Sequence, residues 1–480
     1  MPEVLQLICS LSPVSPPALI ATSLNLISDL NDWFELHMNL LGPVVPWILQ
    51  FATDPRFAYH VAVCFDRITA KCAGPMMQLL PQLFSLISVL EQTTTNGIKV
   101  EEAICSLTRA VSTIISKLPA EEAVVAMQQL CEPIIRNLNR VVPNNTVYPF
   151  VTKFQSTDAT EATHPPSSSN NNNSSASSGA NKENEGGLFK GKSYESWASL
   201  ATRPILWIDR CAFVFKDIWS PNGQSSSSPQ QPSPLLPVAE QLIGALLKSC
   251  RKFEGTPRVI EHSIRSCRLI FRALGPQSRP LVGPVVEMTL SRHTFPLLEN
   301  GGAVNNPDTV DDLFRLAQRF TMRATTIFFT HTISQMLFIH AISNLRLDHP
   351  DASKSITKFI LEILAQLAAA KKTNYSDDGV TRAQLIVDNQ AQHITATALW
   401  MALFSHSGQI RRDMADVILQ IGKHDQEKFK ERIAVAVHSL PNDPMKATAQ
   451  QLTDFVNNVA REKERHAVFN HTRDLAKLFI

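Results

Sequence analysis

A chain of 480 residues is longer than one compact core usually holds, so it predicts several domains or an array of repeats. Hydrophobic residues make up 44% of the chain, which suffices for an extensive core. The 45 Lys and Arg against 43 Asp and Glu argue against a general electrostatic nucleic-acid binder, which needs a broad basic excess. Only local basic stripes fit this balance.

Helical periodicity dominates the first third of the chain. Apolar residues between Val100 and Leu118 follow the i, i+3, i+4, i+7 rule, and a second helical run from Ala120 to Leu138 follows directly after Pro119. Helices are also predicted over 57–72 and 75–90. Each pair of helices takes roughly 40 residues, the period of HEAT and armadillo units.

A single helical pair cannot bury its apolar face, whereas stacked pairs can. The sequence therefore predicts an all-α, HEAT/ARM-type α-α superhelical solenoid with a long concave surface. We expect HEAT repeats over residues 1–155 and 192–480, on the order of ten in all.

Two segments interrupt the helical pattern. Residues 156–191 form a Ser/Asn-rich insert with too few apolar residues to offset chain entropy, so we expect them to be disordered. Residues 221–237, rich in Ser, Pro and Gln, predict a flexible loop between helices. Both fit tolerated surface insertions, and the serine clusters leave open a regulatory role through phosphorylation.

The most informative local pattern is a predicted helix at 258–274. Its arginines are spaced 7, 3 and 4 residues apart and fall within an arc of roughly 80° at the helical period. The apolar residues of the segment lie on the other side, and Glu261 is the only acid within the helix. The arginines are Arg258, Arg265, Arg268 and Arg272.

Two interpretations of this stripe stay open on the residues alone. A solvated charged face is the ordinary one for a surface helix. A stripe of one sign and one residue type also suits an anion, because the planar guanidinium binds phosphate bidentately. The anion would belong to a phosphopeptide or to nucleic acid. Base stacking needs interleaved aromatic residues, and Phe271, the only aromatic in the helix, falls on its apolar side.

Signals of secretion or membrane insertion are weak. The N-terminus lacks a basic n-region, and Pro13, Pro16 and Pro17 break the apolar stretch behind it. The most apolar stretch, 325–342, contains two histidines and other polar residues. We expect an intracellular protein whose eight cysteines, none in a CxxC pair, are mostly buried free thiols.

Motifs of catalysis are missing from the sequence. It has no GxGxxG, no GxSxG elbow and no HExxH. Acid pairs such as Asp311-Asp312 and Asp377-Asp378 are explained by capping and solvation at helix starts or loops. The sequence predicts a binding protein rather than an enzyme, with neither a metal nor a cofactor.

Several collinear segments resemble the transportin-SR group of the importin-β family, the transportin-3-like nuclear import receptors. The most specific is the run NPDTVDDLFRLA at 306–317, followed by Arg319-Phe320. The arginine helix at 258–272 is similar too, as are LWIDR at 206–210, QLTDF at 451–455 and RDLAKLF at 473–479. Importin-13-type receptors fit the 308–320 run and the chain end less well.

The resemblance implies a receptor for serine/arginine-rich splicing factors that shuttles between cytoplasm and nucleus. Arg258, Arg265, Arg268 and Arg272 match the family's basic helix, which holds the phosphorylated arginine/serine tail of the cargo. His262 stands where the family leads us to expect another arginine. Further partners implied are nucleoporins and, in the full-length family, GTP-bound Ran, which engages mainly the N-terminal half and releases the cargo.

Two departures from the family pattern leave an alternative. The likeness starts well inside the family sequence, so the main Ran site is expected to be missing and bound cargo not to be released efficiently. Set against the family pattern, the chain is also expected to be about one HEAT unit shorter between Val282 and Thr294. A truncated isoform or an incomplete gene model would explain both. The alternative function is a HEAT-repeat scaffold without transport activity.

Overall fold

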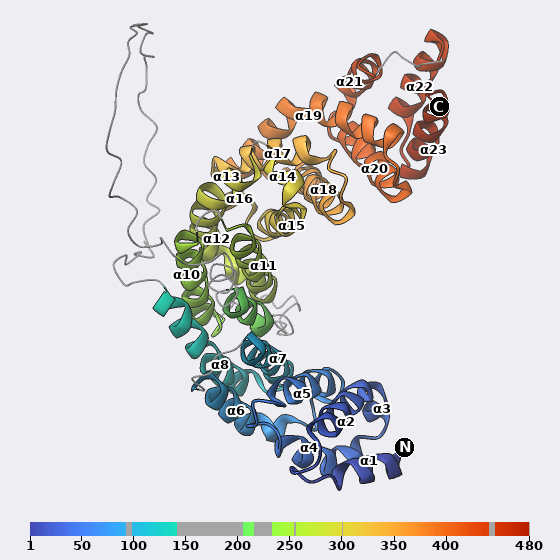
Figure 1. Ribbon diagram of the computed structural model, residues 1–480. Helices are drawn as coiled ribbons and strands as arrows, with labels where there is room; N and C mark the ends of the chain where they lie inside the picture. The colour runs from blue at the N-terminus through green and yellow to red at the C-terminus, as the bar shows by residue number, and fades with distance from the viewer. Residues whose placement is uncertain are drawn as a thin grey trace, which may run out of the picture.

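The computed structural model describes residues 1–92, 98–141, 205–215, 233–253, 256–299, 301–440 and 447–479. Every regular element in these ranges is a helix, which confirms the all-α class. The helices stack along an arc with the two termini at opposite ends, as a HEAT-type superhelix requires (Figure 1). The predicted insert at 156–191 lies outside the described residues.

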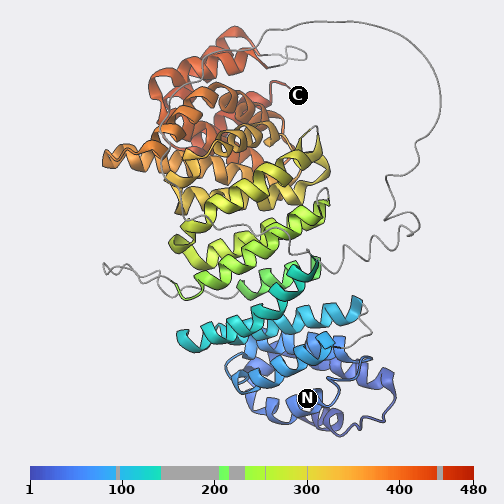
Figure 2. The ribbon, with the colours of Figure 1, turned by 90° about the vertical axis from the view of Figure 1, so that its left-hand side faces the viewer.

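The arc has two layers of helices. An inner row lines the concave side, and an outer row covers the convex side, where successive helices lie one above another (Figures 1 and 2). The inner row includes α5 (Ala58–Cys72), α7 (Ile98–Ile115), α11 (Pro257–Leu274), α15 (Pro307–Arg323), α18 (Pro350–Thr373), α20 (Gly408–His424) and α23 (Arg465–Ala476). The outer row includes α6 (Leu80–Gln92), α8 (Ala120–Val141), α10 (Leu236–Lys252), α16 (Thr325–Thr330), α17 (Ile333–Asn344), α19 (Asp378–Phe404) and α21 (Gln426–His438).

Shorter elements complete the turns and the ends of the arc. They are α1 (Pro2–Cys9), α2 (Pro17–Asp29), α3 (Asn31–Leu36), η1 (Met38–Leu40), α4 (Leu41–Leu49), η2 (Met77–Leu79), η3 (Gly275–Leu281), α12 (Val282–Val285), η4 (Val286–Thr294), α13 (Phe295–Leu298), α14 (Gly302–Asn305) and α22 (Ala449–Arg461). A helical segment also spans residues 205–215.

Helix boundaries follow local chemistry. The helix predicted over 75–90 begins only at Leu80, where Pro81 occupies the first turn, a position that needs no backbone N–H donor. Similarly, α10 begins at Leu236, inside the range expected for the 221–237 loop, with Pro237 in its first turn. The predicted cap at Asp377 is confirmed, since its carboxylate accepts a hydrogen bond of 2.7 Å from the Val380 amide.

The superhelix continues across the stretch where about one repeat is expected to be missing. Residues Val286–Thr294 form a π-helix, a rare element in which each turn holds more residues than in an α-helix. The π-helix packs against α10 and α11 on one side of the stretch and against α17 on the other. The helical array is therefore continuous across this stretch.

The apolar 325–342 stretch is divided between two helices, α16 and α17, with His331 between them. Among the described residues, no helix is long and apolar enough to cross a membrane. The prediction of buried thiols is confirmed: all eight cysteines are free, and seven of them are buried. Burial raises the pKa of the Cys105 and Cys131 thiols to about 12.

Candidate anion-binding surface on the concave face

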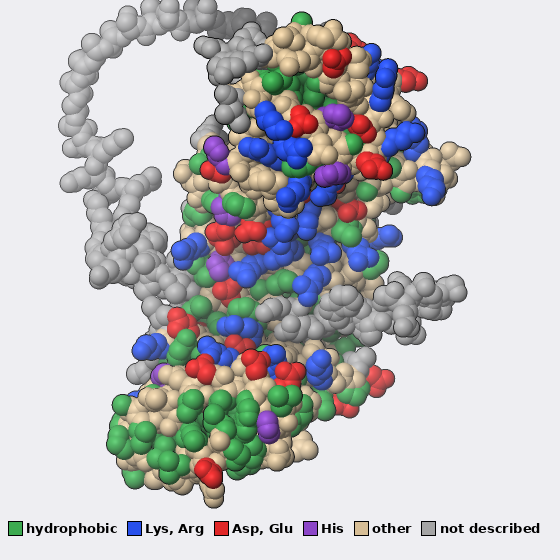
Figure 3. Space-filling model, turned by 90° about the vertical axis from the view of Figure 1, so that its right-hand side faces the viewer, with side chains coloured by type: hydrophobic (Ala, Val, Ile, Leu, Met, Phe, Trp, Pro, Cys, Tyr) green, Lys and Arg blue, Asp and Glu red, His purple; other side chains and the backbone are tan. Residues whose placement is uncertain are grey.

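Lys and Arg side chains gather in the middle of the concave face, over α11, α15 and α18 (Figure 3). Helix α11 contributes the predicted stripe because its apolar side is fixed in the core. Phe271 on that side packs edge-on against Phe320 of α15, with ring centroids 4.9 Å apart. The other buried residues on the predicted apolar side of α11 are Val259, Ile260, Ile264, Cys267, Ile270 and Leu274.

The four predicted arginines share the opposite side of α11, and we call them the α11 row. Arg258, Arg265 and Arg272 are exposed, whereas Arg268 is partly buried. The Arg268 Nε lies 3.1 Å from Oδ1 of Asp312 on α15, an ion pair whose angle falls outside that of a hydrogen bond. The structure thus brings all four together on the concave side, with Arg268 held by an internal carboxylate.

Glu261 is the only acid within the predicted helix, but the structure brings a further carboxylate, that of Asp312, to the row. Asp311 and Asp312 lie in the second turn of α15, not at its cap, and both engage arginines. Asp311 forms an ion pair of 2.8 Å with Arg315, one turn further along the same helix. Burial raises the pKa of Asp312 to about 6, and the neighbouring Arg268 only partly opposes this. Helix stacking, which the sequence of α11 does not encode, supplies these counter-charges.

His262 has a partner of its own. Its Nδ1 lies 2.5 Å from Oδ1 of Asp209 in the 205–215 segment. Burial would lower the pKa of His262, but the hydrogen bond and the charge of Asp209 outweigh it and hold the pKa above its ordinary value. The ring therefore ties α11 to the 205–215 segment at the place where an arginine was expected.

Sequence analysis missed a second line of arginines on α15. Arg315, Arg319 and Arg323 recur every four residues and so share one side of that helix. We call them the α15 row. Burial lowers the pKa of Arg319, and the nearby positive charges of Arg323, Arg272 and Arg268 lower it further. The four-residue spacing was a signal that the sequence already contained.

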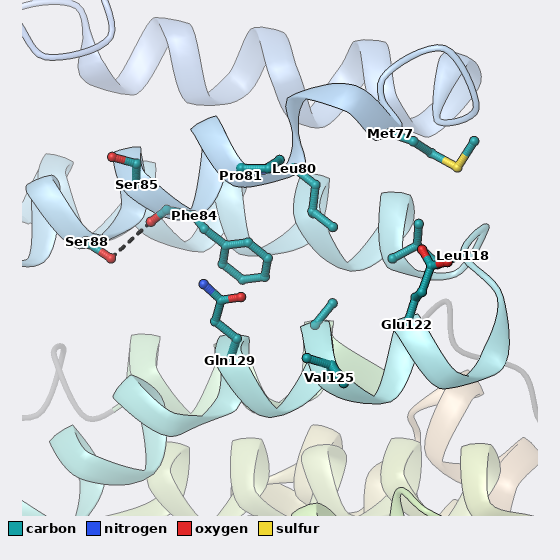
Figure 4. A pocket seen from close by; sticks show the side chains of 11 residues that line it. Met77, Leu80, Pro81, Phe84, Ser85, Ser88, Leu118, Glu122, Val125 and Gln129 are labelled. Carbon is teal, nitrogen blue, oxygen red and sulfur yellow. Dashed lines mark hydrogen bonds between the residues drawn. The ribbon is translucent and has the colours of Figure 1, made fainter.

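A second feature lies on the convex side, between α6 and α8. This groove has a volume of about 670 Å³ and is lined mainly by apolar side chains. Figure 4 shows the Phe84 ring pointing from α6 toward α8, where Val125 and Gln129 lie. Val125 is 65% exposed, so it is open to a partner.

Comparison with known proteins concerns the N-terminal part of the chain and the fold. Residues 1–86 match the model described as the transportin-3/importin-13 third TPR domain. A solved structure entitled "Importin13 cytosolic state" is similar, with a TM-score of 0.53 and 12% identity over 100% of this chain and 52% of that chain. A crystal structure of importin beta has a TM-score of 0.49 and 11% identity, over 97% of this chain and 53% of that chain. The likeness to importin-13 shows the fold, and the chain spans about half the length of these structures.

Proposed function

We propose that this chain is a transportin-3-like member of the importin-β family, as the match of residues 1–86 supports, and that it binds cargo for nuclear import. The proposed ligand is the phosphorylated arginine/serine-rich segment of a splicing factor. The α11 row is the observation that carries this proposal: four arginines on one side of α11, a helix of the inner row, where Lys and Arg side chains gather on the concave face (Figure 3). In this function the protein would shuttle between cytoplasm and nucleus.

The chemistry of both partners supports the match. Phosphoserine carries nearly two negative charges and three acceptor oxygens, which suit a line of guanidinium groups. An arginine/serine segment also carries its own cations. The concave face offers acids beside the arginines, as Figure 3 shows. One of them is Glu261, whose pKa is raised by burial and by the nearby charge of Asp308. A ligand with both signs of charge fits such a surface better than a uniform polyanion.

Single-stranded RNA is a weaker candidate for the same surface. Recognition of splayed bases relies on exposed aromatic rings that stack on them. Phe271, the aromatic residue of α11, is only 1% exposed and packs on Phe320 instead. The α11 row can therefore hold phosphates but offers no platform for bases.

The proposal is tested with the 480-residue chain and an arginine/serine peptide in phosphorylated and unphosphorylated form. We expect fluorescence anisotropy to give at least tenfold tighter binding of the phosphorylated peptide, about 1.4 kcal/mol. Equal affinities would contradict the proposal. Import of a fluorescent cargo into permeabilised nuclei then separates a receptor from a scaffold that binds the same cargo without transporting it.

We further propose that the convex groove between α6 and α8 receives a nucleoporin segment through an aromatic side chain. Its open apolar lining, with Leu80, Phe84 and Val125 on facing helices, suits one inserted ring. Burial of a phenylalanine side chain is worth about 1.5–3 kcal/mol, so a single such anchor yields a weak, rapidly reversible contact.

Replacing Val125 with Glu should abolish this contact, because the carboxylate would lose water when the ring enters the groove. We expect at least a tenfold loss of affinity for a phenylalanine-containing nucleoporin peptide, measured by calorimetry. Val89→Glu is the matched control, since Val89 is also an exposed valine, lies on α6 and does not line the groove. Similar losses in both variants would argue against a site in the groove.

A further inference from the structure

Helices α11 and α15 lie side by side and run in the same direction. Three contacts between them and their flanking residues appear in the same order along both chain segments: Arg268 with Asp312, Phe271 with Phe320, and the Arg279 guanidinium with the Arg323 carbonyl oxygen, at 2.9 Å. The carboxyl ends of the two helices therefore meet at one place on the concave face. Both arginine rows extend to that end.

The arginines of the two rows differ in what neutralises them. Arg268 and Arg315 pair with Asp312 and Asp311, which lie toward the amino end of α15. Within the described ranges, no carboxylate comes within ion-pair distance of Arg319 or Arg323. The two arginines without an acidic partner, Arg319 and Arg323, thus both lie toward the carboxyl end of α15.

Glu362 of α18 has a hydrogen-bond partner of its own. Its charge partly opposes the lowering of the Arg319 pKa, and its Oε1 accepts a hydrogen bond of 2.9 Å from Gln366. Arg279 adds a third guanidinium, because its Nε donates to the Arg323 carbonyl. Partly buried like charges repel one another, and this repulsion weakens when an anion enters among them.

We propose that Arg319 and Arg323 of α15 form, with Arg272 of α11, a phosphate-monoester site between the two helices, and that phosphorylation of the cargo is detected there. The identity of the ligand as a phosphoserine rests on the proposed function. The rest of the α11 row then orients the peptide, with Arg268 held by Asp312. Guanidinium forks from two helices can reach different oxygens of one phosphate, which one row of residues does less well.

The test replaces Arg319 and Arg323 together with Gln in the full chain. We expect at least tenfold weaker binding of the phosphorylated arginine/serine peptide, equivalent to about 1.4 kcal/mol, and little change for the unphosphorylated peptide. Inorganic pyrophosphate, titrated by calorimetry, should lose affinity in parallel. The matched control is Arg461→Gln with Lys463→Gln, which removes two exposed cations near α22.

The outcomes separate this inference from the proposed function. If wild type prefers the phosphorylated peptide and the double Gln variant binds it equally well, the α15 site is wrong and the function stands. If wild type shows no such preference but the variant loses pyrophosphate, the anion site stands and the cargo proposal fails. Pyrophosphate affinity unchanged by the variant, or lost equally in the control, overturns the site.

A purely structural role for these arginines has its own signature. Cations in the last turn stabilise a helix through its dipole, so removal of Arg323 can lower the melting temperature. Arg319→Lys with Arg323→Lys keeps the charge and loses the planar fork. We expect this variant to melt like wild type and still bind the phosphorylated peptide several-fold more weakly. Full affinity in the Lys variant would contradict bidentate recognition.

Discussion

Replacing Arg265 and Arg268 together with Ala is expected to weaken binding of a phosphorylated arginine/serine peptide by at least tenfold. Each charge-assisted contact contributes about 1.5–3 kcal/mol, and about 1.4 kcal/mol already equals a factor of ten. Lys at both positions should restore affinity only in part, because an ammonium group lacks the bidentate fork. Anisotropy with the phosphorylated and unphosphorylated peptides measures both effects.

The double Ala variant should also affect the stability of the fold. Both side chains point away from the apolar side of α11, which by itself predicts an unaltered fold. Arg268, however, is the cation beside the buried carboxylate of Asp312, and its loss leaves that carboxylate without a partner. We expect Arg268→Ala to lower the melting temperature and Arg265→Ala to leave it unchanged.

A matched variant separates stability from binding. Adding Asp312→Asn to the double Ala variant removes the orphaned charge and should recover most of the lost stability, while the peptide affinity stays low. Recovery of affinity together with stability would mean that the arginines act through folding. In that case the α11 row would be an ordinary solvated face.

The second large effect is expected at Arg210, whose side chain is fully buried in the 205–215 segment. Its Nη1 lies 2.7 Å from Oε1 of Glu91 on α6, and its Nε donates to the Thr108 hydroxyl of α7 at 3.1 Å. Breaking a buried ion pair from one side costs about 3–5 kcal/mol, since the other charge is left unpaired. Glu91→Leu should therefore lower the stability of the chain by an amount in that range.

Thermal and urea unfolding of the single and double variants check this prediction. Glu91→Leu combined with Arg210→Met replaces both charges by apolar groups and should recover most of the loss, because removing both ions avoids an unpaired one. A loss below about 1 kcal/mol in the single variant would show that water reaches the site and screens the pair.

The location of Arg210 gives this pair a role beyond local stability. The 205–215 segment contacts α7 through Trp207, whose indole donates to Glu101 at 3.2 Å, and contacts α11 through Asp209 and the Ile208 carbonyl, which accepts from Ser266 at 3.0 Å. It thus connects the N-terminal repeats to the arginine helix. Destabilising this segment should therefore also change the position of the α11 row.

The sequence alone determined the features that depend on local spacing. The helical period placed Ile260, Ile264 and Phe271 on one side of α11 and therefore the arginines on the other, and the structure agrees because a helix rotates by a fixed angle per residue. The cap at Asp377 and the burial of most thiols follow from equally local chemistry. The α15 row could also have been predicted from the sequence, since its four-residue spacing obeys the same rule.

Only the tertiary structure decided which charges meet. Arg268 and Asp312 are 44 positions apart, and Asp209 and His262 are 53 apart, so their pairing depends on how one repeat stacks on the next. The spacing within a helix fixes the direction of a side chain but not the neighbour it faces. For the same reason the convex groove and the junction of the two arginine rows appear only when α6 faces α8 and α11 lies beside α15.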